Sequence, residues 1–239
     1  ACAKITNSEA IKNSKLFPFR YYIAYLMLRN FPGSSRLRKA LQIALEKSVE
    51  NVPKISGKVA ILADTSGSMS SSLTGDYSVV QCIDLVGLFT GIIIRKAEIP
   101  PIVLPFSERV RYDIASAAMQ KETIFEIAKV FSDMYGGGTS LSAPIKWLIA
   151  ENEPVDTIIA FTDNEEWVGE GFLEAFLEYK QRVAPHVKAY FVTLLPYRDY
   201  PVPPQMEDVY FVFGWNDNVL RYITTNPKKQ MEEIRKIEY

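Results

Sequence analysis

From residue 58 onward, short runs of aliphatic residues alternate with longer amphipathic stretches. Such runs are typical of strands buried on both faces, and their alternation with helical patterns predicts an α/β fold, a mainly parallel sheet with helices on both faces. Strands are predicted at 58–64, 102–107, 110–114, 155–163, 187–195 and 208–213. Helices are predicted at 77–97, 122–134, 142–151, 171–183 and 216–224.

The second and third predicted strands, 102–107 and 110–114, lie very close together in the sequence. Glu108 and Arg109 alone separate them, and two residues are too few for a crossover connection. We therefore expect an antiparallel hairpin. The sheet would then have six strands, five of them parallel and one reversed at an edge.

Upstream of this pattern, residues 8–56 read as helical. An aromatic helix is expected at 19–29, and the next helix, 36–50, repeats apolar residues at spacings of three and four. Two helices with one apolar face are not stable alone, so they either pack on the α/β part of the chain or end a helical array that began upstream. A chain that starts at Ala1 without an initiator Met favours the second reading.

The chain is therefore divided into three parts. Residues 1–56 form a helical segment, residues 57–225 form the α/β domain, and residues 226–239 form a charged tail. Pro227 suits the first turn of a helix in that tail.

Amino-acid composition favours a folded globular protein over a disordered or membrane-spanning one. A content of 48% hydrophobic and 23% charged residues is typical of a folded globular protein. The longest apolar stretch, 85–94, is much shorter than the ~20 residues of a membrane-spanning helix, so no membrane partner is expected. The two cysteines, Cys2 and Cys82, are far apart, which fits a reducing compartment and predicts a cytoplasmic protein.

Charge is divided unevenly along the chain. Residues 1–58 carry 11 Lys or Arg against 3 Glu, whereas the other 181 residues carry 16 basic and 25 acidic side chains. A basic segment of this kind favours contact with a polyanion. Solvated helix faces, with charges that dock the segment onto the acidic domain, explain the pattern equally well.

Asp64, Ser66 and Ser68 directly follow the aliphatic run 59–63. Ligands bind beyond the carboxyl ends of parallel strands, and a carboxylate with two hydroxyls offers the hard oxygen donors that suit Mg²⁺. An ordinary strand-to-helix turn also uses Asp, Ser and Gly. This pentapeptide alone leaves both readings open.

Two further segments are expected at the same edge of the sheet. Three glycines at 136–138 precede Thr139, and the predicted strand 155–163 ends in Asp163. Glycines let the backbone approach a ligand closely. Because these groups converge with Asp64 if the sheet is parallel, together they favour a cation site.

The combination resembles the metal-ion-dependent adhesion site of von Willebrand factor A domains, and this resemblance implies a Rossmann-like A domain. It implies an ion held through the hydroxyls of Ser66, Ser68 and Thr139, with Asp64 and Asp163 contributing directly or through water. The expected ion is Mg²⁺, with Mn²⁺ or Ca²⁺ as alternatives. An open coordination position would accept an Asp or Glu of a protein partner.

The stretch 162–167, Thr-Asp-Asn-Glu-Glu-Trp, resembles the Ro autoantigen family, in which a ring of HEAT-like helical repeats (the TROVE module) precedes one A domain. Residues 8–54 resemble the end of that ring. The resemblance implies a ribonucleoprotein in RNA quality control, which binds small noncoding Y RNAs outside the ring and the ends of misfolded RNAs in its basic hole. In this chain the basic segment could contribute phosphate contacts. The candidates are Lys12, Lys15, Arg20, Arg36, Arg38 and Lys39.

Three function classes remain in competition. The leading hypothesis is a noncatalytic binding module, in which Glu165, Glu166 and Trp167 lie beside the metal and face a partner. The second is a metal-dependent hydrolase that uses Glu165 or Glu166 on RNA, although no second metal cluster is visible for two-metal phosphate cleavage. The third is an extracellular adhesion A domain, against which the missing secretory signal and the unpaired cysteines count.

Overall fold

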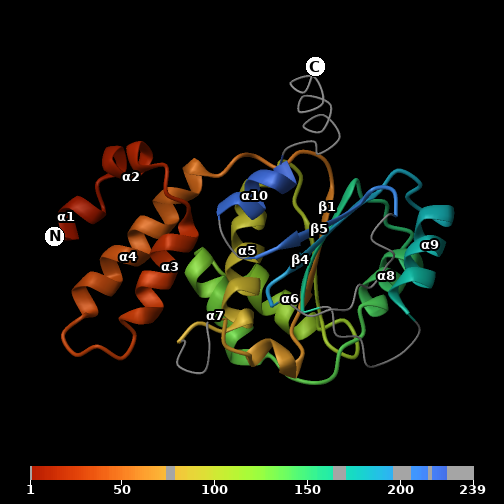
Figure 1. Ribbon diagram of the computed structural model, residues 1–239, viewed down its shortest axis with the longest axis horizontal. Helices are drawn as coiled ribbons and strands as arrows, with labels where there is room; N and C mark the ends of the chain where they lie inside the picture. Colours follow the sequence, from red (N-terminus) through yellow and green to blue (C-terminus); the bar gives the residue numbers. More distant parts are fainter. Residues whose placement is uncertain (1, 74–78, 164–170, 196–205, 215–216, 225–239) are drawn as a thin grey trace, which may run out of the picture.

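A five-stranded sheet forms the centre of the protein in a computed structural model that describes residues 2–73, 79–163, 171–195, 206–214 and 217–224. All neighbouring strands are parallel, in the order β2-β1-β3-β4-β5 (Figure 1). The strands are β1 Val59–Asp64, β2 Ile102–Phe106, β3 Thr157–Thr162, β4 Lys188–Thr193 and β5 Val209–Phe213. Five of the six predicted strands are thereby confirmed.

Helices cover both faces of the sheet, as predicted (Figure 1). Side chains alternate along β1, so that Ile61 and Ala63 join one core cluster while Ala60 and Leu62 join the other. The first cluster is closed by α5 Cys82–Lys96, α7 Ile124–Met134 and α10 Asp217–Thr224. The second is closed by α8 Ser142–Ala150 and α9 Phe172–Arg182. Every position of β1 is buried, which explains its unbroken aliphatic sequence.

The predicted antiparallel strand at 110–114 is wrong. Val110 makes one isolated antiparallel bridge to Phe106, and the chain then forms helix α6, Tyr112–Met119. Ile114 and Ala118, four residues apart, are both buried, so this segment has a helical and not a strand period. The sheet is therefore five-stranded and parallel throughout, with β2 at one edge.

Glycines bring α5 and α7 into close contact. A Cβ atom at Gly87 would lie 2.8 Å from Cα of Ala128, and one at Gly91 would lie 3.0 Å from Cγ2 of Ile124. The distance at Gly87 is shorter than real Cβ contacts, and the one at Gly91 requires Ile124 to shift, so glycine at these two positions allows the close spacing of the helices. Helix α7 leads directly into the glycine segment 136–138, and its position therefore affects the sheet edge at which the candidate metal ligands lie.

The helical segment packs on the α/β domain. It contains α1 Cys2–Ile5, α2 Ser8–Ser14, α3 Pro18–Met27, α4 Ser35–Ser48 and the 3-10 turn η1 Val49–Asn51. Phe17, Phe19 and Tyr22 are buried in the same core cluster as α5 and α7. The ring of Tyr25 meets that of Phe125 edge to face, with centroids 4.4 Å apart. The α/β domain therefore covers at least part of the segment's apolar face.

No helix within the described ranges is long and apolar enough to cross a membrane. The predicted tail helix at 226–239 lies outside the described residues.

Candidate metal site

Three loops at the carboxyl end of the sheet are joined by backbone hydrogen bonds. Thr65 donates to the carbonyl oxygen of Phe106 through both its N–H and its hydroxyl, each at 2.8 Å. The Gly136 N–H donates to the Thr65 carbonyl at 2.7 Å, and the Gly67 N–H donates to that of Gly137 at 2.9 Å. The Asp64–Ser68 turn, the end of β2 and the glycine segment 136–138 thus form one connected surface.

Asp64 occupies the last position of β1, directly before Thr65. Its side chain is completely buried. One carboxylate oxygen accepts the Ser66 backbone N–H at 2.9 Å, and the other accepts the Thr162 hydroxyl at 2.9 Å. Asp163, just beyond the end of β3, is also completely buried. Two strand-end carboxylates therefore lie at the same edge, as the sequence predicts.

The three predicted hydroxyl ligands lie on the loops that follow at the same edge of the sheet. The Ser66 and Ser68 hydroxyl oxygens are 3.1 Å apart, with Ser66 buried and Ser68 in the short 3-10 turn η2, Gly67–Ser70. Thr139 is buried and follows Gly137 by two residues, a separation of at most ~7 Å along the chain. The structure thus brings all five predicted ligands to one edge of the sheet.

The electrostatics of Asp64 suit a cation. Burial raises the pKa of the Asp64 carboxyl to about 7, and the nearby Asp163 carboxylate acts in the same direction against the hydrogen bonds from Ser66 and Thr162. None of the ion pairs within the described ranges includes Asp64. Burial and the charge of Asp163 also raise the pKa of the adjacent Cys82 thiol to about 12, so this thiol stays protonated. A cation would compensate buried negative charge here.

The set of donors selects the kind of ion. Across the described residues, no three side chains among His, Cys, Asp and Glu gather into a metal-ligating group. A site with two carboxylates and three hydroxyls offers oxygen donors alone. Such donors suit a hard cation such as Mg²⁺ and not a zinc centre built from Cys and His.

The predicted partner residues Glu165, Glu166 and Trp167 lie outside the described residues. The predicted RNA contacts fall in the helical segment. Five of them are exposed: Lys12, Lys15, Arg20, Arg36 and Lys39. Arg38 differs because it is half-buried and its guanidinium lies 5.9 Å from the Tyr25 ring centroid, which gives it a packing role.

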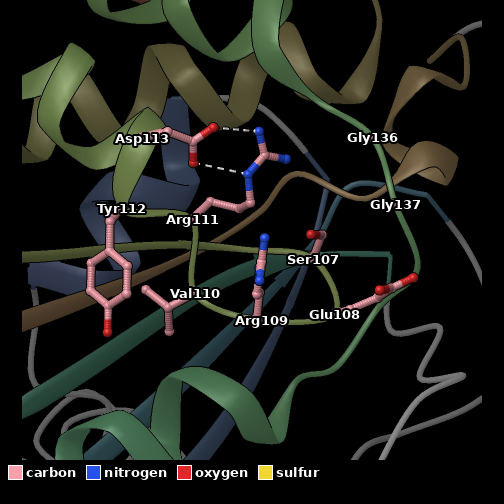
Figure 2. A pocket seen from close by; sticks show the side chains of 9 residues that line it. All are labelled: Ser107, Glu108, Arg109, Val110, Arg111, Tyr112, Asp113, Gly136 and Gly137. Atoms are coloured by element: carbon pink, nitrogen blue, oxygen red, sulfur yellow. Dashed lines mark hydrogen bonds and ion pairs between the residues drawn. The ribbon is translucent and has the colours of Figure 1, made fainter.

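A cavity of about 640 Å³ adjoins the same surface (Figure 2). Its wall comes from residues 107–113, which run from the end of β2 into the start of α6, and from Gly136 and Gly137. Sequence reasoning missed it, because Glu108 and Arg109 were assigned to a hairpin turn. The available signal was their place directly after β2, at the carboxyl end of a parallel strand.

Comparisons with known proteins identify the family of the α/β domain. Residues 58–225 match the family model described as "Ro60 vWA domain". The chain is 26% identical over 231 residues to an "RNA-binding protein RO60" of Deinococcus radiodurans, and 23% identical over 217 residues to one of Caenorhabditis elegans. These matches cover 89% and 83% of this chain, respectively.

A solved structure shows the same fold. The crystal structure of the Deinococcus radiodurans RO (RSR) protein matches 93% of this chain with a TM-score of 0.75 at 21% identity. The chain spans 41% and 32% of the two curated relatives and 47% of the chain in that crystal structure. The match to that structure confirms a von Willebrand A-like α/β domain preceded by helices.

Proposed function

Since the chain belongs to the Ro60 vWA domain family, we propose that its α/β domain is a cation-dependent docking module of a Ro-type RNA-binding protein. The observation that carries this proposal is the environment of Asp64. Its buried carboxylate sits beside a second buried carboxylate, and no ion pair within the described ranges includes it. A divalent cation bound there would offset the unfavourable free energy of burying two carboxylates next to each other.

The residues at the sheet edge would have two different roles toward the ion. Ser66, Ser68 and Thr139 would hold the ion through their hydroxyl oxygens, and Asp64 and Asp163 would supply negative charge directly or through water. Mg²⁺ is the proposed ion, with Mn²⁺ or Ca²⁺ as alternatives. When bound, it supplies a positive charge and a coordination position for a carboxylate. The hydrogen bonds to Ser66 and Thr162 keep Asp64 in one orientation.

The proposed partner at this site is a protein with an accessible Asp or Glu. The RNA partner belongs to the whole protein. Both curated relatives are named RNA-binding proteins, and RNA binding by the whole protein is part of the same proposal. The basic helical segment would contribute phosphate contacts to a small noncoding RNA. The two free cysteines support a cytoplasmic location within the same proposal.

Calorimetric titration with MgCl₂ and MnCl₂ tests the metal assignment. Binding to the wild-type chain is expected, together with loss of binding in Asp163→Asn. The matched control is Asp156→Asn, because Asp156 lies just before the opposite end of β3 and accepts the Lys58 N–H there. Circular dichroism confirms that both variants fold. Equal titration curves for wild type and Asp163→Asn would contradict the metal site.

The same variants separate docking from hydrolysis. We propose that the domain is not an enzyme, so RNA incubated with the wild-type chain and Mg²⁺ is expected to stay intact. Cleavage that is lost in Asp163→Asn and kept in Asp156→Asn would replace the docking proposal with a metal-dependent hydrolase.

A further inference from the structure

The cavity beside the candidate metal site is positioned to contact anything bound there. Gly137 lines the cavity, and its carbonyl oxygen accepts the N–H of Gly67, the residue between Ser66 and Ser68. Ser107 lines it too, and its carbonyl oxygen accepts the N–H of Ser140, next to Thr139. Residues that line the cavity are thus hydrogen-bonded to neighbours of three candidate metal ligands.

Charges on the cavity wall differ in how they are compensated. Arg111 donates two hydrogen bonds to Asp113, at 2.9 and 2.7 Å, and a third to the Met134 carbonyl at 3.2 Å. The Glu108 carboxylate accepts the Gly138 N–H at 3.3 Å. In Figure 2, Glu108 points toward the glycine segment and away from Arg109.

Arg109 carries the uncompensated charge on the cavity wall. Its side chain is exposed and makes no hydrogen bond or ion pair with any part of the chain that the structure describes. Figure 2 shows it extending toward Arg111, whose own charge is balanced by Asp113. The cavity therefore presents one uncompensated guanidinium, a group that binds carboxylates well through its planar set of donors.

We propose that this cavity binds an acidic residue next to the partner's metal-binding Asp or Glu, with Arg109 pairing its carboxylate. The inference rests on the proposed function and names the partner more closely: a segment with two or more neighbouring acidic residues. A volume of about 640 Å³ lies within the range of about 300–1,000 Å³ usual for ligand sites. Val110 and the exposed Tyr112 offer apolar contact to the aliphatic part of a Glu side chain.

An acidic peptide fits this wall better than a nucleic acid does. A cavity for an RNA backbone would gather several free cations, because affinity for phosphates grows with the number of charges neutralised. Among the described residues of this wall a single cation is free, and Glu108 lies on the same wall. One separate negative charge beside the metal-binding carboxylate matches this arrangement.

Two synthetic peptides test the inference: acetyl-Glu-Asp-Glu-amide and acetyl-Gln-Asp-Gln-amide, titrated into the full chain with saturating Mg²⁺. We expect the Glu peptide to bind the wild type about fivefold more tightly, the gain of a partly exposed ion pair. Arg109→Gln is expected to bind both peptides equally, and Arg109→Lys to keep part of the preference. The matched control is Arg182→Gln on α9, where an exposed arginine pairs with Glu178.

The outcomes separate the two proposals. Absence of Mg²⁺ binding to the wild type, measured without peptide, contradicts the proposed function. If Mg²⁺ binds and the Gln peptide binds, an unchanged preference in Arg109→Gln overturns the cavity assignment alone. If Mg²⁺ binds but neither peptide does, both the docking function and the cavity assignment are contradicted. Displacement of the Glu peptide by inorganic phosphate or a short RNA, in wild type but not in Arg109→Gln, assigns the cavity to phosphate and also overturns the inference.

Discussion

The carboxylate of Glu46 accepts the backbone N–H of Ile124 at 2.7 Å, so a residue of the helical segment caps a helix of the α/β domain. The Thr123 side chain caps α7 by accepting the Glu126 N–H, which leaves the first two N–H groups of the helix for other acceptors. Glu46 takes the first of them and lies 3.4 Å from the second, that of Phe125. The helical segment therefore holds the start of the helix that leads into the glycine segment and Thr139.

Replacing Glu46 tests this capping contact. Glu46→Ala is expected to lower the free energy of unfolding by about 1 kcal/mol, because the Ile124 N–H loses its acceptor. Glu46→Gln keeps a carbonyl oxygen and should cost less. Urea denaturation followed by circular dichroism measures both. Equal stability of wild type and Glu46→Ala would show that water replaces the contact without loss.

The same residue predicts a dependence of stability on pH. Burial raises the pKa of the Glu46 carboxyl above its ordinary value of 4.5, against the lowering effect of the two N–H groups. The folded state then binds this proton more tightly than the unfolded state does. The stabilisation of the folded state by the protonated Glu46 carboxyl is therefore fully present below pH 4.5 and is lost as the pH rises through the raised pKa. The free energy of unfolding of wild type, relative to that of Glu46→Gln, should fall as the pH rises from 4.5 to above the raised pKa of Glu46. A difference that increases with pH would contradict the assignment.

The contact between α5 and α7 predicts an unusual sign for a helix substitution. Gly→Ala inside a helix normally stabilises by about 1 kcal/mol. At Gly87 the added Cβ would meet backbone atoms of Ala128 at 2.8 and 2.9 Å, and overpacking of this kind costs about 1–3 kcal/mol. Gly87→Ala should therefore lower the melting temperature.

Gly91→Ala is the matched comparison on the same helix. Its nearest contact is a side-chain atom, Cγ2 of Ile124, at 3.0 Å, which has more freedom to move. A smaller decrease is expected there. A higher melting temperature for Gly87→Ala would show that the helices separate easily.

Sequence reasoning succeeded where the backbone alone decides the outcome. The aliphatic run of β1 and its terminal Asp64 predict a buried parallel strand, and a parallel sheet necessarily brings Asp163 to the same edge. The error at 110–114 arose because Val110, Tyr112 and Ile114 alternate with polar residues. The decisive signal was Ala118, four residues after Ile114, which a five-residue window excludes.

Contacts between residues far apart in the chain could not be predicted from the sequence. Glu46 and Ile124 are 78 residues apart, and nothing in a lone Glu on a helix indicates which amide it will meet. The cavity beside Arg109 depends on the path of the turn after β2 and on where the glycine segment crosses it. Neither follows from periodicity. Metal binding by the five converging residues stays a prediction.

Thermal unfolding with and without Mg²⁺ tests the role of a hydroxyl ligand. A ligand present at 100 times its dissociation constant stabilises the folded state by about 2.7 kcal/mol. Thr139→Val keeps the shape of the buried side chain but removes its oxygen, so the Mg²⁺-dependent rise in melting temperature should largely disappear. Thr139→Ser keeps the hydroxyl and should keep the rise. An equal rise in Thr139→Val and wild type would remove Thr139 from the site.

The exposed basic residues of the helical segment are predicted to contribute to RNA affinity. Arg20 lies over the Phe19 ring and Arg38 over the Tyr25 ring, so both are left intact to avoid loss of packing. The quadruple variant neutralises the exposed Lys12, Lys15, Arg36 and Lys39 to Gln. Affinity for single-stranded RNA should fall equally for different sequences, because phosphate contacts carry no base information.

Salt dependence gives the sharper measurement of this effect. The slope of log affinity against log salt concentration should decrease by about 0.7 for each phosphate contact removed. The matched control neutralises four exposed basic residues of the α/β domain, Lys121, Lys129, Lys146 and Arg182. Filter binding over a range of KCl concentrations provides both slopes. If the control lowers affinity and slope as much as the quadruple variant does, the RNA contacts are not concentrated in the helical segment, and its positive charge serves instead to dock it onto the acidic domain.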